Sequence, residues 1–205
     1  MKTRQSKLSF HPLTPARWAD VEKLFGERGA CGGCWCMYWR QTRAQFEQRK
    51  GAGNRRAFRK LVRAGAEPGV LAYADGEPVG WCALAPRRQY VKLENSRVLA
   101  PVDEQPVWSV VCFFISREWR NRGLSAKLLR AAADFARRRG AKILEGYPVE
   151  ARKGRMPDAF AWTGLPGSFL RAGFREVARR SPTRPIMRKT VASGPSALFE
   201  ASKKS

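Results

Sequence analysis

The sequence predicts an α+β fold with helix, sheet and helix layers around one mixed β-sheet. An Asp75-Gly76 pair between two β-type runs is typical of an antiparallel hairpin. Residues 107–115 are nearly continuously apolar, and a helical pattern and a further short strand follow them, which together indicate a βαβ unit. The chain of 205 residues is long enough to bury one core. We therefore expect a single domain over residues 1–190.

The N-terminal segment predicts a strand followed by a helix. Residues 8–13 read as a short strand, and Thr14-Pro15 is a helix-start signal. The helix that follows has apolar residues at helical spacing, namely Trp18, Val21, Leu24 and Phe25. Gly26 and Gly29 are expected to end it.

A loop and two basic helices are predicted before the hairpin. Residues 30–40 hold thiols and aromatic rings at unusual density and are predicted to form a loop. Residues 41–64 are helical in pattern and very basic, and a break at residues 51–54 divides them. We expect Asn54 to cap the second helix. The hairpin strands are predicted over residues 70–74 and 78–84.

The C-terminal half predicts the buried centre of the sheet. Residues 87–105 are polar and irregular, whereas residues 107–115 predict a buried strand. The next helix is predicted from its apolar positions, Leu124, Leu128, Leu129, Ala132, Phe135 and Ala136, and from a basic C-terminal turn before Gly140. The remaining predictions are a strand at 142–147, a basic loop at 152–157, a helix at 167–172, strands at 174–180 and 184–189, and a weakly ordered tail at 191–205.

The chain is strongly basic, with 40 Lys and Arg against 17 Asp and Glu and a formal net charge of +23. Such a charge attracts polyanions, so a non-catalytic nucleic-acid-binding protein is the alternative function. The basic residues are spread along the chain, which favours this alternative less than a single basic block would. No run approaches the roughly 20 apolar residues of a membrane span, and no signal core follows the basic start. We expect a cytoplasmic protein without a membrane partner.

A basic glycine turn joins the buried strand to its helix. Arg120, Arg122 and Gly123 lie directly before the helical pattern. Glycine lets backbone approach a ligand closely, and the unpaired amides of a helix N-terminus suit phosphate. A diphosphate-bearing ligand fits this turn, although a solvated turn before an ordinary helix explains it equally well.

The order of these elements resembles the GNAT acetyltransferase superfamily over residues 8–189. The segment Arg120-Asn121-Arg122-Gly123-Leu124-Ser125 is similar to the family's acetyl-CoA loop, with Ser125 where a Gly or Ala is usual. The resemblance implies a mostly antiparallel sheet with a central, splayed parallel strand pair, and transfer of an acetyl group from acetyl-CoA to a primary amine. It also implies that Phe113, Phe114 and Ile115 pair with pantetheine, while the loop residues bind the rest of the cofactor.

The resemblance leaves the catalytic groups open. Phe169 stands where many relatives have a tyrosine that protonates the leaving thiolate, and Trp162 is nearest to a family asparagine. The candidate general bases are Asp103, Glu104, Glu145 and Glu150, Tyr147 is a candidate acid, and Ser109 could orient substrate. For each of them, a surface, ion-paired or packing role is more common than a catalytic one. Without them, catalysis would rest on proximity.

The loop over residues 30–40 has two further readings. Cys31, Cys34 and Cys36 have the short spacing of zinc ligands, but no fourth ligand is evident, so we predict no metal and reduced, packed thiols. In the family this region often shapes the acceptor pocket. We therefore expect Trp35, Tyr38 and Trp39 to line a substrate cleft, with aromatic packing as the alternative. The oligomeric state stays open, a dimer included.

Overall fold

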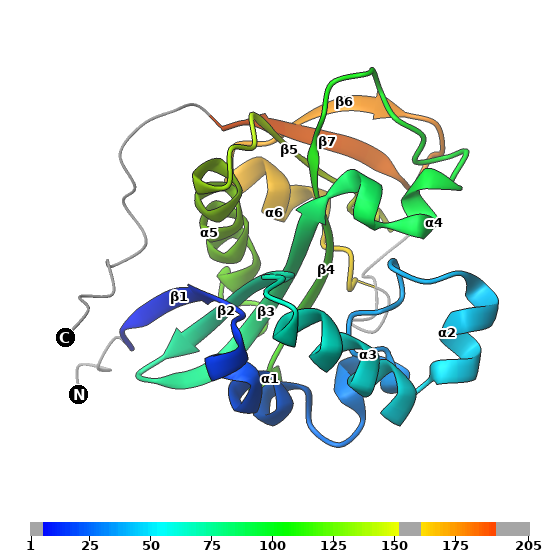
Figure 1. The fold of residues 1–205 in the computed structure, drawn as a ribbon. Helices are drawn as coiled ribbons and strands as arrows, with labels where there is room; N and C mark the ends of the chain where they lie inside the picture. The colour runs from blue at the N-terminus through cyan, green and yellow to red at the C-terminus, as the bar shows by residue number, and fades with distance from the viewer. Residues whose placement is uncertain (1–5, 152–160, 192–205) are drawn as a thin grey trace.

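A seven-stranded sheet forms the centre of the protein, with strand order β1-β2-β3-β4-β5-β7-β6 (Figure 1). The structure, a computed structural model, describes residues 6–151 and 161–191. The strands are β1 (Leu8–Pro12), β2 (Gly69–Ala74), β3 (Glu77–Pro86), β4 (Trp108–Ile115), β5 (Ile143–Gly146), β6 (Arg175–Arg179) and β7 (Pro185–Thr190). All neighbouring strands are antiparallel except β4 and β5, which confirms the predicted mixed sheet.

The parallel pair separates after a short contact. β4 pairs with β5 only from Trp108 to Val110. On its other side β4 has a register shift, because Leu84 pairs with Val110 and Ala83 with Cys112. Val111 is therefore an extra residue, a β-bulge, which bends a strand and interrupts its pairing. The bulge also places two consecutive side chains, Val111 and Cys112, on the same face of the sheet.

Helix α5 (Leu124–Arg138) covers one face of the sheet, together with α6 (Pro166–Arg171) (Figure 1). Its apolar stripe is buried, in agreement with the predicted helical spacing. The core on this face includes side chains from β2, β4 and β5, among them Val70, Val110 and Leu144. The long helix thus fixes the position of its own N-terminus relative to the end of β4.

The opposite face carries the N-terminal helices, α1 (Trp18–Phe25), α2 (Arg43–Arg49) and α3 (Ala52–Arg63) (Figure 1). Aromatic rings fill this second core, where Phe25 stands 6.1 Å from Trp81 and 5.6 Å from Phe114 between ring centroids. Between α1 and α2 the chain forms one π-type turn, η2 (Gly29–Gly33). This turn lies against the N-terminus of α3.

Asn54 does not cap α3, which was the expectation from sequence. The helix begins earlier, with Gly51 at the cap position in a conformation with φ of 76°. Asn54 is buried in the first turn of the helix, and its amide donates to the Gly33 carbonyl at 3.2 Å. The Gly51 amide donates to the same carbonyl at 3.0 Å. Both bonds hold the η2 turn against α3.

Other differences from the predicted elements are small. The irregular segment after β3 contains two short turns of helix, η3 (Arg87–Gln89) and α4 (Val91–Glu94). A further short turn, η4 (Arg117–Trp119), follows β4. The predicted basic loop at 152–157 and all of the predicted tail except Val191 lie outside the described residues. Within the described ranges, no helix combines the length and apolar character needed to cross a membrane.

A buried polar network joins the β4–β5 pair to the segment after β3. Arg87, which is only 8% exposed, donates to the Tyr147 hydroxyl at 2.9 Å and to the carbonyls of Leu93 and Leu99 at 2.9 and 2.8 Å. The Tyr147 hydroxyl in turn donates to the Glu145 carboxylate at 2.6 Å. Burial, and then the Glu145 charge, raise the pKa of the Tyr147 phenol well above its ordinary value. The phenol therefore keeps its proton.

Replacement of Arg87 is expected to destabilise the fold strongly. An Arg87→Met substitution leaves the buried carbonyls of Leu93 and Leu99 without their donor, which costs about 1–3 kcal/mol of unfolding free energy for each carbonyl. Arg88→Met is the matched control, because Arg88 is the exposed neighbour in the same turn. Urea denaturation measures both variants. Equal stability of the two would show that the network contributes nothing.

Candidate functional site

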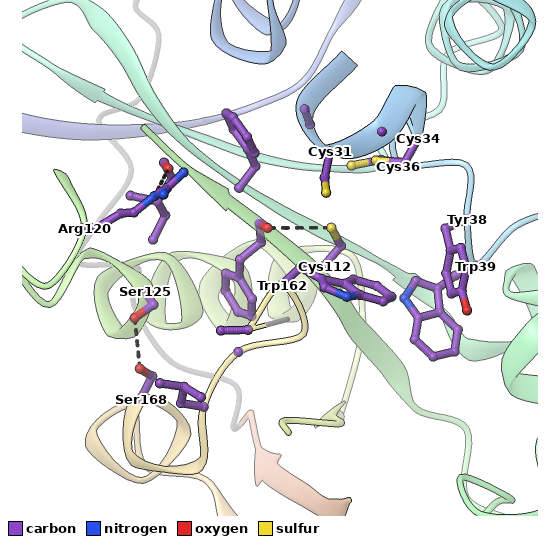
Figure 2. Close-up of a pocket in the computed structure, with 18 of the residues that line it drawn as sticks. Cys31, Cys34, Cys36, Tyr38, Trp39, Cys112, Arg120, Ser125, Trp162 and Ser168 are labelled. Atoms are coloured by element: carbon purple, nitrogen blue, oxygen red, sulfur yellow. Dashed lines mark hydrogen bonds between the residues drawn. The ribbon is translucent and has the colours of Figure 1, made fainter. Parts of the chain in front are cut away.

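A cavity of about 540 Å³ opens where β4 separates from β5. Its walls come from the end of β4, the turn before α5, the η2 loop with the residues after it, and residues 161–168. Figure 2 shows the Arg120 and Ser125 side chains at one end of this cavity and Tyr38 and Trp39 at the other, with Cys112 and Trp162 between them. The cavity thus has a polar end beside α5 and an aromatic end beside the N-terminal helices.

The polar end is built by the turn between β4 and α5. Arg120 folds back so that its Nε donates to the Ile115 carbonyl at 3.0 Å. Gly123 has a left-handed φ of 74° and caps α5, and an added Cβ there would meet no atom within 4 Å. A side chain at this position would therefore project into open space at the N-terminus of α5, and glycine keeps that space free for a ligand.

Ser125 ties the first turn of α5 to α6. Its Oγ lies 2.9 Å from the Oγ of Ser168. Both hydroxyls border the cavity, so the floor of the polar end is held by two helices. Ser168 was not expected from sequence, because a serine in a short helix carries no signal of its own.

The splayed end of β4 already has one backbone partner. The Phe113 amide, which points away from β3, donates to the Trp162 carbonyl at 2.7 Å. The chain after residue 160 thus reaches into the opening between β4 and β5. Any ligand that pairs with the Phe113 amide has to displace this carbonyl.

The predicted cofactor residues divide into two groups. Six line the cavity: Phe113, Phe114, Ile115, Arg120, Asn121 and Ser125. The other three do not. The Arg122 guanidinium lies 5.6 Å from the centroid of the Trp119 ring. The Leu124 side chain is buried in the core under α5. Gly123 has no side chain. The side chains of Arg122 and Leu124 therefore lie outside the described lining, and their predicted contact with the cofactor stays a prediction.

The aromatic end is a cluster of rings around Tyr38. Its ring centroid lies 5.4 Å from Trp39, 5.4 Å from Phe46 and 5.1 Å from Trp162. Lys92 places its ammonium 3.2 Å from the Tyr38 centroid, a cation–π contact. The cluster joins segments that are far apart in sequence. Phe46 and Lys50 also line the cavity and were not expected, because α2 resembles an ordinary basic helix in sequence.

Trp35 does not line the cavity, so its predicted role as a substrate contact is wrong for this geometry. The ring is 4% exposed and packs against Trp18 and Phe25, at centroid distances of 6.3 and 5.7 Å. Trp35 belongs to the core between α1 and α3. Tyr38 and Trp39 do line the cavity.

Thiols line the wall between the two ends, from Cys31, Cys34, Cys36 and Cys112. The buried Cys36 accepts a hydrogen bond from the Trp81 indole at 2.8 Å. Burial raises the pKa of the Cys34 thiol to about 11. In the part of the chain that the structure describes, no group of three or more Cys, His, Asp or Glu side chains has the arrangement of a metal site.

The candidate acids and bases lie outside the cavity. Glu145 is fully buried and accepts from Tyr147 and from Arg188, at 2.6 Å each, while Ser109 lies 2.8 Å from the Tyr147 hydroxyl. The catalytic predictions for Glu145 and Tyr147 therefore do not fit their positions, because both belong to the buried network. Glu104 is exposed in the loop before β4.

The other two carboxylates are also held elsewhere. Asp103 accepts from Arg188 at 2.6 and 3.1 Å, and this bond lowers the pKa of its carboxyl group. Glu150 pairs with Arg179. Phe169, in the place of the family's tyrosine, is fully buried against Phe113 and Phe174.

Alkylation should find Cys34 unreactive at neutral pH. A thiol with a pKa near 11 holds few thiolates at pH 7, and the thiolate is the reacting species. We expect the rate of Cys34 modification by iodoacetamide, followed by peptide mass spectrometry, to rise about tenfold per pH unit from pH 7 to pH 9. A rate that is already constant above pH 7 would contradict the neutral thiol.

Comparisons with known proteins agree with this geometry. The sequence model of the acetyltransferase (GNAT) family matches residues 34–151. No curated protein matches the sequence significantly. A GNAT-family acetyltransferase from Listeria monocytogenes is similar in structure, with a TM-score of 0.55 and 11% identity over 89% of this chain and 94% of the other.

Two further solved structures share the fold. The protein yncA from Salmonella typhimurium, solved with its cofactor acetyl-CoA, has a TM-score of 0.51 and 12% identity over 95% of this chain and 99% of the other. The aminoglycoside N-acetyltransferase AAC(6')-Iy, solved with CoA, has a TM-score of 0.51 and 15% identity over 87% and 95%. Together with the family match, which spans more than half of the sequence, these observations show that the chain belongs to the GNAT acetyltransferase family.

Proposed function

We propose that this protein transfers the acetyl group of acetyl-CoA to the nitrogen of a primary amine. The observation that carries the proposal is the single cavity that joins the N-terminus of α5 to the aromatic cluster along the splayed end of β4. Membership of an acetyltransferase family supports the reaction class, and a structure of the same fold was solved with acetyl-CoA.

The polar end of the cavity suits the cofactor's diphosphate. The first amides of α5 have no partner within the helix, and its 15 residues direct a positive dipole end toward the cavity. Asn121 and Ser125 offer polar groups beside these amides. The pantetheine arm would then follow β4, where it competes with the Trp162 carbonyl for the Phe113 amide.

The charge on α2 and α3 assists capture of an anionic donor. The exposed side chains of these helices include the cations Arg43, Arg49, Lys50, Arg56, Arg59, Lys60 and Arg63. A cavity beside such a surface gathers anions and raises their rate of association. Salt should therefore weaken acetyl-CoA binding.

Transfer rests on positioning. The amine nitrogen attacks the thioester carbon, the new carbon–nitrogen bond forms, and the carbon–sulfur bond breaks. The sulfur leaves as a thiolate, and the proton that the nitrogen releases goes to water or to the departing sulfur. Among the described lining residues there is no carboxylate or histidine to remove the proton of the amine. Holding the two reactants in contact supplies the rate enhancement.

Substitution of Gly123 should abolish acetyl-CoA binding. A Gly123→Trp side chain would occupy the open space in front of the α5 amides. Gly140 is a matched control, because it has a φ of 81°, also faces open space, and follows the other end of α5. We expect calorimetry to show a loss of affinity of at least about 100-fold for Gly123→Trp and no change for Gly140→Trp.

Both variants place a side chain at positive φ, which costs about 1–2 kcal/mol of stability in each. A comparison of the two therefore separates blocking of the site from strain in the backbone. Unchanged affinity in Gly123→Trp would refute the placement of the diphosphate.

A further inference from the structure

A row of exposed cations runs along the outward face of α3. Arg56, Lys60 and Arg63 are all exposed, and at about 3.6 residues per turn their side chains leave the helix axis within about 60° of one another. With a rise of about 1.5 Å per residue, these three residues span about 10 Å. None of the three side chains has a hydrogen bond or an ion pair with another described residue, and residues 48–66 contain no Asp or Glu. The described fold therefore does not neutralise this charge.

Arg49, in the last turn of α2, extends the row at its N-terminal end. Gly53 lies three residues before Arg56 in α3, and a Cβ added to Gly53 would lie 3.0 Å from the Arg49 Cβ. The Arg49 stem thus packs on the first turn of α3, while its side chain is exposed and has no partner among the described residues. The basic row is the set of four residues Arg49, Arg56, Lys60 and Arg63.

Basic side chains next to the row are, by contrast, bound within the fold. Arg55 donates to the Glu22 carboxylate at 2.9 and 2.6 Å, and the Arg59 guanidinium lies 5.7 Å from the centroid of the Trp18 ring. On other elements, cations that are engaged with carboxylates include Arg87, Arg179 and Arg188. The basic row differs from these residues because it pairs with no described carboxylate.

The charges of the row repel one another. Arg56 and Lys60 are four residues apart and Lys60 and Arg63 are three apart, which are the spacings at which side chains on a helix are neighbours. Like charges at these spacings destabilise a helix. A bound polyanion would offset this repulsion, and the field of the row raises the local concentration of polyanions.

The surface around the row distinguishes between classes of polyanion. On α2 and α3, all of whose residues the structure describes, no large apolar or aromatic side chain is exposed. Sites for single-stranded nucleic acid add aromatic rings on which bases stack, and helices that lie on membranes insert apolar side chains. The backbone of a duplex requires neither, because its phosphate groups face outward and bind to cations alone.

We propose that the basic row binds the phosphate backbone of a nucleic-acid duplex, without reading its base sequence. A duplex carries about one negative charge per 1.7 Å of its axis, so a row of about 10 Å faces several phosphates. All but one of the four residues are arginines, whose guanidinium groups can donate two parallel hydrogen bonds to a phosphate. None of the four lines the cavity, so this binding is a second function beside the proposed acetyl transfer.

Fluorescence anisotropy of a labelled duplex of about 20 base pairs tests the proposal on the full-length protein. At about 100 mM NaCl we expect a Kd in the micromolar range, typical of backbone binding. The logarithm of the association constant should fall with the logarithm of the salt concentration at a slope of about −2.7 or steeper, which corresponds to three phosphate contacts. A single strand of the same length should bind at least about fivefold more weakly. Saturating acetyl-CoA should not displace the duplex, since the row lies outside the cavity lining.

Two variants that each lose three positive charges locate the contact. The first replaces three cations of the row, by Arg56→Gln, Lys60→Gln and Arg63→Gln. Its duplex affinity should fall at least about 10-fold, and its salt slope should become flatter by about 0.9 for each lost phosphate contact. The matched control removes three exposed cations elsewhere in the chain that likewise have no described partner, by Arg97→Gln, Lys142→Gln and Arg175→Gln. Its Kd should change by less than about twofold, because salt screens charges more than a Debye length from the duplex.

A thermal melt of both variants shows whether each is folded. The inference is wrong if the duplex does not bind at micromolar concentrations, or if the control variant loses as much affinity as the variant of the row. Tighter binding to the single strand, tighter binding to phosphatidylserine vesicles in co-sedimentation, or displacement of the duplex by acetyl-CoA would also overturn it. Acetyl-CoA binding is measured independently by calorimetry, and its failure would refute the proposed function while leaving duplex binding to stand.

Discussion

The position of the cavity follows from the separation of β4 and β5. One extra residue, Val111, bends β4 after only a short parallel pairing, so that the two strands part inside the sheet. The cavity occupies the opening between the two strands. Its polar end lies where β4 ends and α5 begins. Its aromatic end lies on the face of the sheet toward which Val111 and Cys112 both point. Cores on both faces, and the Arg87 network at the paired end of the strands, hold this arrangement in place.

The described residues that line the cavity include no carboxylate or histidine, so the proposed transfer depends on how the two reactants are positioned. The Glu145 carboxylate on β5 accepts hydrogen bonds from Tyr147 and Arg188. Burial keeps the Tyr147 phenol protonated, so that it remains a donor in this network. Phe169 fills the position of a family acid with a ring that supports Phe113. The described lining of the cavity thus consists of rings, thiols, small polar side chains, backbone and two cations. These cations favour the approach of an anionic donor.

The sequence predicted the sheet, the long helix and the cofactor turn because these features have local signals. The Asp75-Gly76 turn, the apolar run of β4 and the spacing along α5 each depend on nearby residues alone. The acceptor end was predicted only in part. Tyr38 and Trp39 were found by their composition, but Trp35 has the same composition and is a core residue, and only tertiary packing distinguishes them. Phe46, Lys50 and Ser168 reach the cavity through the arrangement of α2 and α6, which no local pattern encodes. Glu145 and Tyr147 looked like free catalytic groups because their partners, Arg87 and Arg188, are distant in the chain.

A crystal structure with acetyl-CoA would show where the cofactor lies in this cavity. We expect the diphosphate to accept hydrogen bonds from the first amides of α5, and the Phe113 amide to exchange the Trp162 carbonyl for the pantetheine arm. The acetyl group should face Trp39 and Trp162 beside Cys112. In that position an amine nitrogen in the aromatic end could approach the thioester carbon to about 3–3.5 Å. A cofactor bound away from α5, or an acetyl group directed away from the aromatic cluster, would contradict this placement of the cofactor.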